Sequence, residues 1–132
     1  MSCHLLTFTS SQFDVSVERP NPINRIAGES VLSWLREQLR IDGYEATVPE
    51  PEDWGWYMYV RCTGGSYLVG AGSDVDQAEP REWAIQIHRE RSVSDKLFGR
   101  NRLAPDDPLS AVIERIVRGN QYARDVAVDR KA

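Results

Sequence analysis

The sequence predicts an α+β fold in which two amphipathic helices pack on one face of a mainly antiparallel sheet of about five to six strands. Two observations indicate this class. Four strand-like segments follow one another through the middle of the chain with short connections, which join antiparallel neighbours. One segment with helical spacing of its apolar residues precedes these strands and another follows them, so we expect the second face of the sheet to be partly solvated.

In the N-terminal third of the chain, the sequence pattern predicts a hairpin followed by a helix. Apolar and polar residues alternate over 13–18, which is typical of a half-buried strand, and residues 6–8 would form its partner across a turn at 10–12. Apolar residues then recur at helical spacing from about 26 to 41, and Gly43 stands where a left-handed C-cap belongs. The stripe of this helix comprises Ala27, Val31, Trp34, Leu35, Gln38 and Leu39, with Trp34 at its centre.

Four strands are predicted in the middle of the chain. The pair Gly64-Gly65 marks a tight hairpin between the second and the third, and an acidic loop at 73–80 separates the third from the fourth. Residues 92–102 are predicted to be irregular, with one helical turn around 95–98. The four strands cover residues 44–48, 54–62, 66–71 and 82–90.

The second helix has the clearest boundary signals. Asp107 is a good N-cap, Pro108 suits the first helical position, and Gly119 follows the end. The alternation over 122–129 is compatible with an edge strand but leaves the structure of this segment open, and we expect residues 129–132 to fray. The apolar face of the helix comprises Leu109, Val112, Ile113, Ile116 and Val117.

Composition limits the class of protein. A chain of 132 residues fits a single domain, and 41% hydrophobic with 27% charged residues is ordinary for a globular protein and untypical of disordered or membrane proteins. The N-terminus does not have the pattern of a secretory signal. The two cysteines, Cys3 and Cys62, form no disulfide framework, so we expect free thiols and a cytoplasmic location.

The net charge of −4 conceals an asymmetry along the chain. Residues 42–80 carry eight acidic side chains against one arginine, which gives −7, whereas residues 81–102 carry six basic and three acidic side chains, which gives +3. Such a distribution steers a charged partner or favours self-association through complementary ends.

Successive side chains of a strand point to opposite faces of the sheet. This alternation, here called strand parity, assigns the side chains of the two best-defined strands to faces. Two sets are apolar and are expected to face the helices: Trp54, Trp56, Met58, Val60 and Cys62 in one strand, and Trp83, Ile85 and Ile87 in the other. The opposite face would carry Tyr57, Tyr59, Gln86 and His88, with Glu45 and Thr47 beside them, unless Gly55 shifts the register. An aromatic and polar face of this kind suits recognition, although cross-strand aromatic pairs also simply stabilise open sheets.

The residues that could support catalysis or bind metals form no convincing set. Cys62 and His88 would suit a thiol nucleophile and its base, but parity places them on opposite faces. The acidic residues at 74–76 lack the spacing of a calcium loop, and Cys3 and His4, in a terminal segment, belong to no four-ligand zinc pattern. We therefore expect no catalytic residue, no metal and no other cofactor.

These patterns favour a small acidic protein-interaction module that binds another protein or a second copy of itself, without membrane contact. Bacterial secretion chaperones and toxin-immunity proteins resemble it in size, acidity and helix-on-sheet arrangement, although no motif is shared. One alternative is a small-molecule binder or enzyme with a pocket at the sheet end near Trp54 and His88. A second is nucleic-acid binding through the basic segment 89–102, which the low pI of about 5.2 disfavours. The candidate partner-binding residues are Trp54, Tyr57, Tyr59, His88, Arg89 and Arg91.

Overall fold

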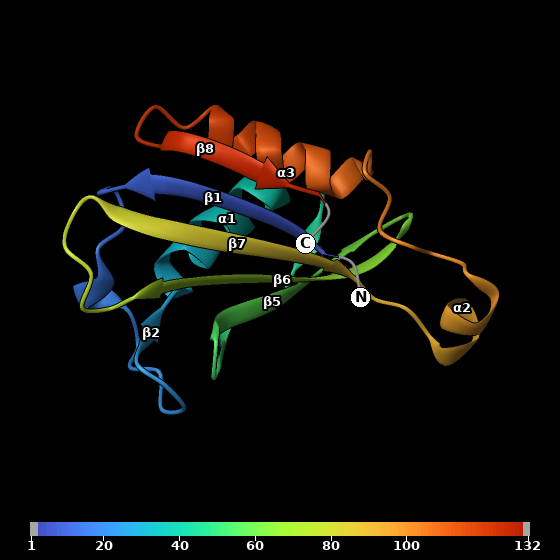
Figure 1. The fold of residues 1–132 in the computed structure, drawn as a ribbon, viewed down its shortest axis with the longest axis horizontal. Helices are drawn as coiled ribbons and strands as arrows, with labels where there is room; N and C mark the ends of the chain where they lie inside the picture. Colours follow the sequence, from blue (N-terminus) through green and yellow to red (C-terminus); the bar gives the residue numbers. More distant parts are fainter. Residues whose placement is uncertain (1–2, 131–132) are drawn as a thin grey trace.

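The computed structural model describes residues 3–130 and has an α+β fold built on a mainly antiparallel sheet (Figure 1). The predicted class is confirmed, but the sheet has eight strands rather than five to six. The strands are β1 (His4–Ser10), β2 (Ile26–Ala27), β3 (Glu45–Ala46), β4 (Glu50–Glu52), β5 (Gly55–Cys62), β6 (Gly65–Asp74), β7 (Arg81–Arg89) and β8 (Arg124–Asp129). The helices are α1 (Glu29–Ile41), α2 (Val93–Phe98) and α3 (Pro108–Arg118), with a 3-10 turn at Val15–Val17.

The sheet follows the order β3-β5-β6-β7-β1-β8, while β2 pairs with β6 and β4 pairs with β5. All of these pairs are antiparallel. The predicted meander is confirmed in β5, β6 and β7, and the turn at Thr63 and Gly64 leads into Gly65, whose φ of 147° suits glycine. Relative to the six predicted segments, the sheet gains the short strands β2 and β4 and the C-terminal strand β8, and it lacks the strand predicted over 13–18.

The predicted hairpin at the N-terminus is wrong. The segment 13–18 is a loop with a 3-10 turn, in which the Asp14 carboxylate accepts a hydrogen bond from the Ser16 amide. Phe13 is buried and packs edge-on against Trp34 and Trp83. The two edges of β1 are instead taken by β7 and β8, which lie far away in the sequence, so local alternation gave no sign of these pairs.

The first helix begins later than its apolar spacing predicts. Ile26 and Ala27 pair with the end of β6, and α1 starts at Glu29. The Glu18 carboxylate accepts hydrogen bonds from the amides of Gly28 and Ser30, so a side chain from a distant loop caps the helix. The predicted end of this helix is confirmed, because Gly43 follows it with a φ of 91°.

The core lies between the sheet and the two long helices. The alternation predicted for β5 and β7 is confirmed, since the members of both apolar sets that lie within these strands pack in or against the core. In α1, Leu32 is fully buried whereas Trp34 is half-buried, so the stripe is centred on the leucines rather than on Trp34. The fully buried side chains of the two helices are Val31, Leu32, Leu35, Leu39, Leu109, Ile113 and Val117.

Helix α3 begins and ends where the sequence predicts, with Asp107 as its N-cap and Gly119 after its last residue. The Asp107 carboxylate accepts hydrogen bonds from the amides of Leu109 and Ser110, at 3.0 and 3.1 Å, and so caps α3. Residues 124–129 form the edge strand β8, and Asp129 lies opposite Leu5. Fraying was predicted for residues 129–132, which is wrong for Asp129, because it is the last residue of β8; residues 131–132 lie outside the described part. The described helices are too short or too polar to cross a membrane.

Candidate functional site

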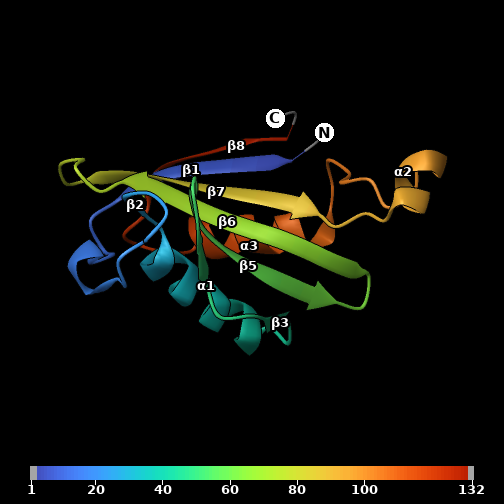
Figure 2. The same cartoon turned by 90° about the horizontal axis from the view of Figure 1, so that it is seen from below.

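The two long helices cover one face of the sheet, and the opposite face, here called the open face, carries the predicted recognition residues. Neighbouring strands place Tyr57, Gly70 and Gln86 in one row and Tyr59, Leu68 and His88 in the next. The Tyr57 and Tyr59 rings contact each other edge-on, with centroids 5.6 Å apart, and Tyr59 is 43% exposed. In Figure 2, β6 and β7 pass in front of α3, so the view is toward this face.

Trp54 lies on the open face, which corrects the prediction that it shares the core face with Trp56. It belongs to the turn before β5, and Gly55 follows with a φ of 145°, so strand parity does not extend back to Trp54. The Trp54 ring lies directly over Gly70, where the Cβ of any other residue would collide with it. A glycine within a strand is a sequence signal for such a close approach.

A hollow of about 400 Å³ lies on the open face between Trp54 and α2, and we call it the Trp54 hollow. Leu68, Gln86 and His88 contribute to it from β6 and β7, while Lys96 comes from α2. Four of the six predicted partner-binding residues therefore meet around one space. The lining residues are Trp54, Leu68, Gln86, His88, Arg89, Glu90, Arg91, Lys96 and Leu103.

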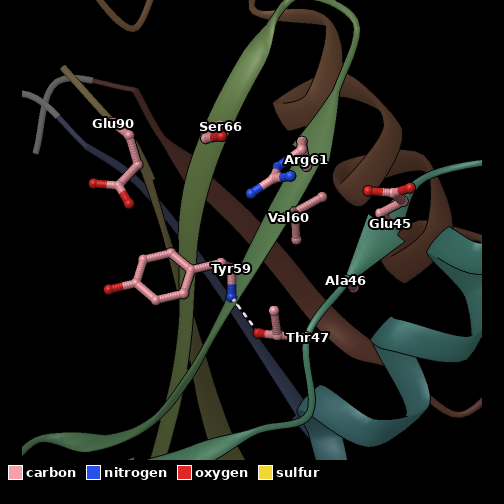
Figure 3. Close-up of a pocket in the computed structure, with 8 residues that line it drawn as sticks. All are labelled: Glu45, Ala46, Thr47, Tyr59, Val60, Arg61, Ser66 and Glu90. Atoms are coloured by element: carbon pink, nitrogen blue, oxygen red, sulfur yellow. Dashed lines mark hydrogen bonds between the residues drawn. The ribbon is translucent and has the colours of Figure 1, made fainter. Parts of the chain in front are cut away.

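The remaining two predicted residues adjoin this space. Tyr57 lies beside Gly70 in the same row as Gln86. Tyr59 lines a second hollow of about 540 Å³, which shares Glu90 with the first. In Figure 3, Glu90 and the Tyr59 ring lie on one side of Arg61, with Glu45 on the other side. The Thr47 hydroxyl accepts a hydrogen bond from the Tyr59 amide at 2.9 Å, which joins the predicted neighbour Thr47 to this edge (Figure 3).

Residues 91–102, here called the arm, project beyond the end of the sheet and carry α2 (Figures 1 and 2). Ser92 and Asp95 form a reciprocal capping box at its start, and Gly99 ends it with a φ of 65°, as the sequence predicted a helical turn here. Three apolar side chains of the arm are nearly fully exposed, namely Val93 at 77%, Leu97 at 74% and Phe98 at 73%.

Arg89 and Arg91, which were predicted to bind a partner, hold the arm in place. Arg91 donates to the carbonyl oxygens of Arg100 and Asp95, at 3.0 and 3.2 Å. Arg89 donates to the Gly64 carbonyl and to the Asn101 side chain, and its guanidinium lies 3.8 Å from Asp107. Both side chains are therefore engaged within the chain and position the arm.

A buried polar cluster lies beneath the start of α3, and sequence reasoning missed it. His4, which we had assigned to a loose terminal segment, is 1% exposed, and its Nδ1 lies 2.6 Å from the Ser110 hydroxyl. Burial lowers the pKa of His4, the nearby Arg130 lowers it further, and Asp107 opposes both. The Tyr67 hydroxyl donates to Asp107 at 2.8 Å, and burial raises the pKa of Tyr67.

Neither pairing of a nucleophile with a base is placed for catalysis. Ser110 and His4 are both enclosed under α3, so a substrate has no access to the hydroxyl. Cys62 packs against the core, whereas His88 lies on the open face with its Nε2 3.1 Å from the Gln86 side-chain oxygen, and burial lowers its pKa. Among residues 3–130, no group of three histidine, cysteine or acidic side chains is arranged to hold a metal ion.

Comparison with protein-family models, with curated proteins and with solved structures finds no match for this chain. The candidate site combines an aromatic sheet face, a hollow beside Trp54 and a projecting apolar arm.

Proposed function

We propose that this chain is a protein-binding module that uses the open face of its sheet together with the arm. The observation that carries the proposal is the exposure of Val93, Leu97 and Phe98 at the tip of an arm that is held by its own hydrogen bonds. Exposed apolar side chains that lie close together mark interaction sites more often than single ones do. Full burial of a valine, leucine or phenylalanine contributes about 1.5–3 kcal/mol, so three such residues suffice for the centre of an interface.

The order of the arm strengthens the proposal. The capping box of α2, the left-handed Gly99 and the two bonds from Arg91 fix the arm before any partner arrives. A fixed binding element loses less conformational entropy on association than a flexible one, so more of the burial free energy is available for affinity. The open face then supplies a second, aromatic surface beside the arm, through Trp54, Tyr57 and Tyr59.

The cytoplasm is the compartment in which we expect this module to act. Cys3 and Cys62 are both free thiols in the structure. Cytosolic proteins keep their thiols reduced, whereas small secreted domains commonly pair theirs.

Substitution at the tip of the arm tests the proposal. The variant carrying Leu97→Ser and Phe98→Ser removes exposed apolar surface without touching the core. A matched control carries Val17→Ser and Ile41→Ser, whose side chains are 76% and 72% exposed elsewhere on the molecule. Each tagged protein is used to capture partners from nuclease-treated native lysate, and the recovered proteins are compared by quantitative mass spectrometry.

We expect one stoichiometric protein to be recovered with the parent chain and the control but lost with the arm variant. Equal recovery from the arm variant and the control would contradict the role of the arm. A protein that disappears only when nuclease is added would point instead to nucleic acid bound through the basic segment 89–102.

A second candidate function is the binding of a small ligand in the Trp54 hollow. The convergence of Trp54, His88 and Arg91 on one space favours it. A ligand that binds the native state alone raises the midpoint of thermal unfolding, so a compound screen read by thermal shift tests this alternative. The shift produced by a true ligand of this hollow should be lost in His88→Ala.

A further inference from the structure

We propose that the Trp54 hollow binds an acidic segment of the partner protein, with a carboxylate directed to Lys96 and Arg91 and an adjoining apolar side chain against Trp54. This inference rests on the proposed function, because it names the kind of protein segment that the module recognises. The hollow of about 400 Å³ accommodates one or two side chains rather than a folded surface.

The apolar half of the site is preformed. The Cζ3–Cη2 edge of the Trp54 ring packs against Gly70, and the ring also borders the hollow. Leu68 extends the apolar surface from the neighbouring strand. A phenylalanine or leucine of the partner would bury its side chain between Trp54 and Leu68, in the way that aromatic anchors fill pockets in protein interfaces.

The polar half of the site carries more positive than negative charge. Within the described residues, Lys96 has no acidic side chain within 4.0 Å, and the two hydrogen bonds of Arg91 go to carbonyl oxygens rather than to a carboxylate. Arg89 differs, since Asp107 lies beside its guanidinium. Two cations therefore face the single acid Glu90 at the rim, which favours an anionic ligand.

The distribution of charge on the open face favours a short acidic peptide over a nucleic acid. On the far side of Trp54, a further hollow of about 460 Å³ is lined by Asp74 and Asp76 together with Arg25. A polyphosphate chain extending along the face would meet these carboxylates. A peptide with a few acidic residues ends within the basic half and avoids them.

The test uses the full chain and dye-labelled hexapeptides blocked at both ends. One peptide has three glutamates around one phenylalanine, and its counterpart has lysine in place of each glutamate. Binding is measured by fluorescence anisotropy at low and at moderate salt. We expect the glutamate peptide to bind, the lysine peptide not to bind, and the affinity to fall as salt rises, because exposed charge pairs are screened.

Two charge-reversal variants assign the binding to the hollow. Lys96→Glu should lower the affinity for the glutamate peptide about fivefold, since it replaces an attraction at the rim by a repulsion. Arg25→Glu changes the net charge by the same amount on the other side of Trp54, where Arg25 is exposed and 3.8 Å from Asp76, and it should change the affinity less than about twofold. Equal effects of the two variants would overturn the assignment.

The remaining outcomes separate this inference from the proposed function. If neither peptide binds, or if an oligothymidylate of similar length binds more tightly than the glutamate peptide, the acidic-segment inference is wrong. The proposed function still stands in that case, provided that the arm variant with Leu97→Ser and Phe98→Ser loses its captured protein. If the glutamate peptide binds as expected while the arm variant keeps every captured protein, the inference holds and the role of the arm fails.

Discussion

Replacing Asp107 by alanine tests the contact that joins α3, the sheet and the arm. One carboxylate oxygen of Asp107 accepts the amides of Leu109 and Ser110, and the other accepts the Tyr67 hydroxyl at 2.8 Å. Arg89, which also holds the arm, lies 3.8 Å away. Since Asp107 is 2% exposed, water does not replace the lost oxygens without rearrangement of the packing.

The expected loss of stability follows from these partners. Removal of an N-cap costs about 1 kcal/mol, and a buried hydroxyl left without a partner costs about 1–3 kcal/mol, so Asp107→Ala should lower the free energy of unfolding by about 3 kcal/mol. Tyr67→Phe removes one hydrogen bond without leaving an unsatisfied group on the tyrosine, and it should cost about 1 kcal/mol.

Urea unfolding followed by tryptophan fluorescence measures both effects, with equal m-values as the sign that the unfolded states are comparable. The double variant should lose at least about 1 kcal/mol less than the sum of the two single variants, because no hydroxyl is then left unpaired. The neighbouring exposed residue gives a control, and Asp106→Ala should change stability by less than about 0.5 kcal/mol. If Asp107→Ala costs no more than Asp106→Ala, the cluster does not stabilise the fold.

Three further predictions follow from the buried histidine and the open face. Because the pKa of His4 is lowered from 6.5, the unfolded chain binds its proton more readily, so the unfolding free energy should fall as the pH drops below 6.5, and His4→Asn should weaken this dependence in urea titrations at several pH values. Gly70→Ala should push the Trp54 ring off its seat, which would shift tryptophan emission to longer wavelength; an unchanged spectrum would contradict the placement. Tyr57→Ala combined with Tyr59→Ala should abolish partner capture while costing about 1 kcal/mol of stability, and unchanged capture and self-association would rule out the sheet face as the contact surface.

The parts of the fold that were predicted correctly are those determined by local patterns. Alternation placed Trp83, Ile85 and Ile87 on the core face, and the cap at Asp107 located the start of α3. The failures lie where distant segments meet. No local pattern shows that β1 pairs with β7 and β8, or that the Glu18 carboxylate caps α1, because both contacts join segments that only the folded chain brings together.

The candidate site was predicted in its composition but not in its arrangement. Strand parity placed Trp54 and His88 on opposite faces, whereas the alternative of a pocket near both residues placed them together. The turn before Gly55 brings them to the same face. The apolar residues of the arm were read as part of an irregular segment, since a helix of six residues is too short to show a clear period. Their exposure depends on the arm standing away from the sheet, which is a property of the tertiary structure.

The arm is attached in such a way that the side chains at its tip contribute nothing to the core. It leaves the sheet after Arg89, returns to the body at Leu103, which is 7% exposed, and contributes no fully buried side chain from α2. Replacement of its tip residues therefore leaves the core untouched, so under the proposed function the partner could change at almost no cost in stability. Under that proposal the fold is a fixed frame, and changes in this one short loop would give related proteins with different partners.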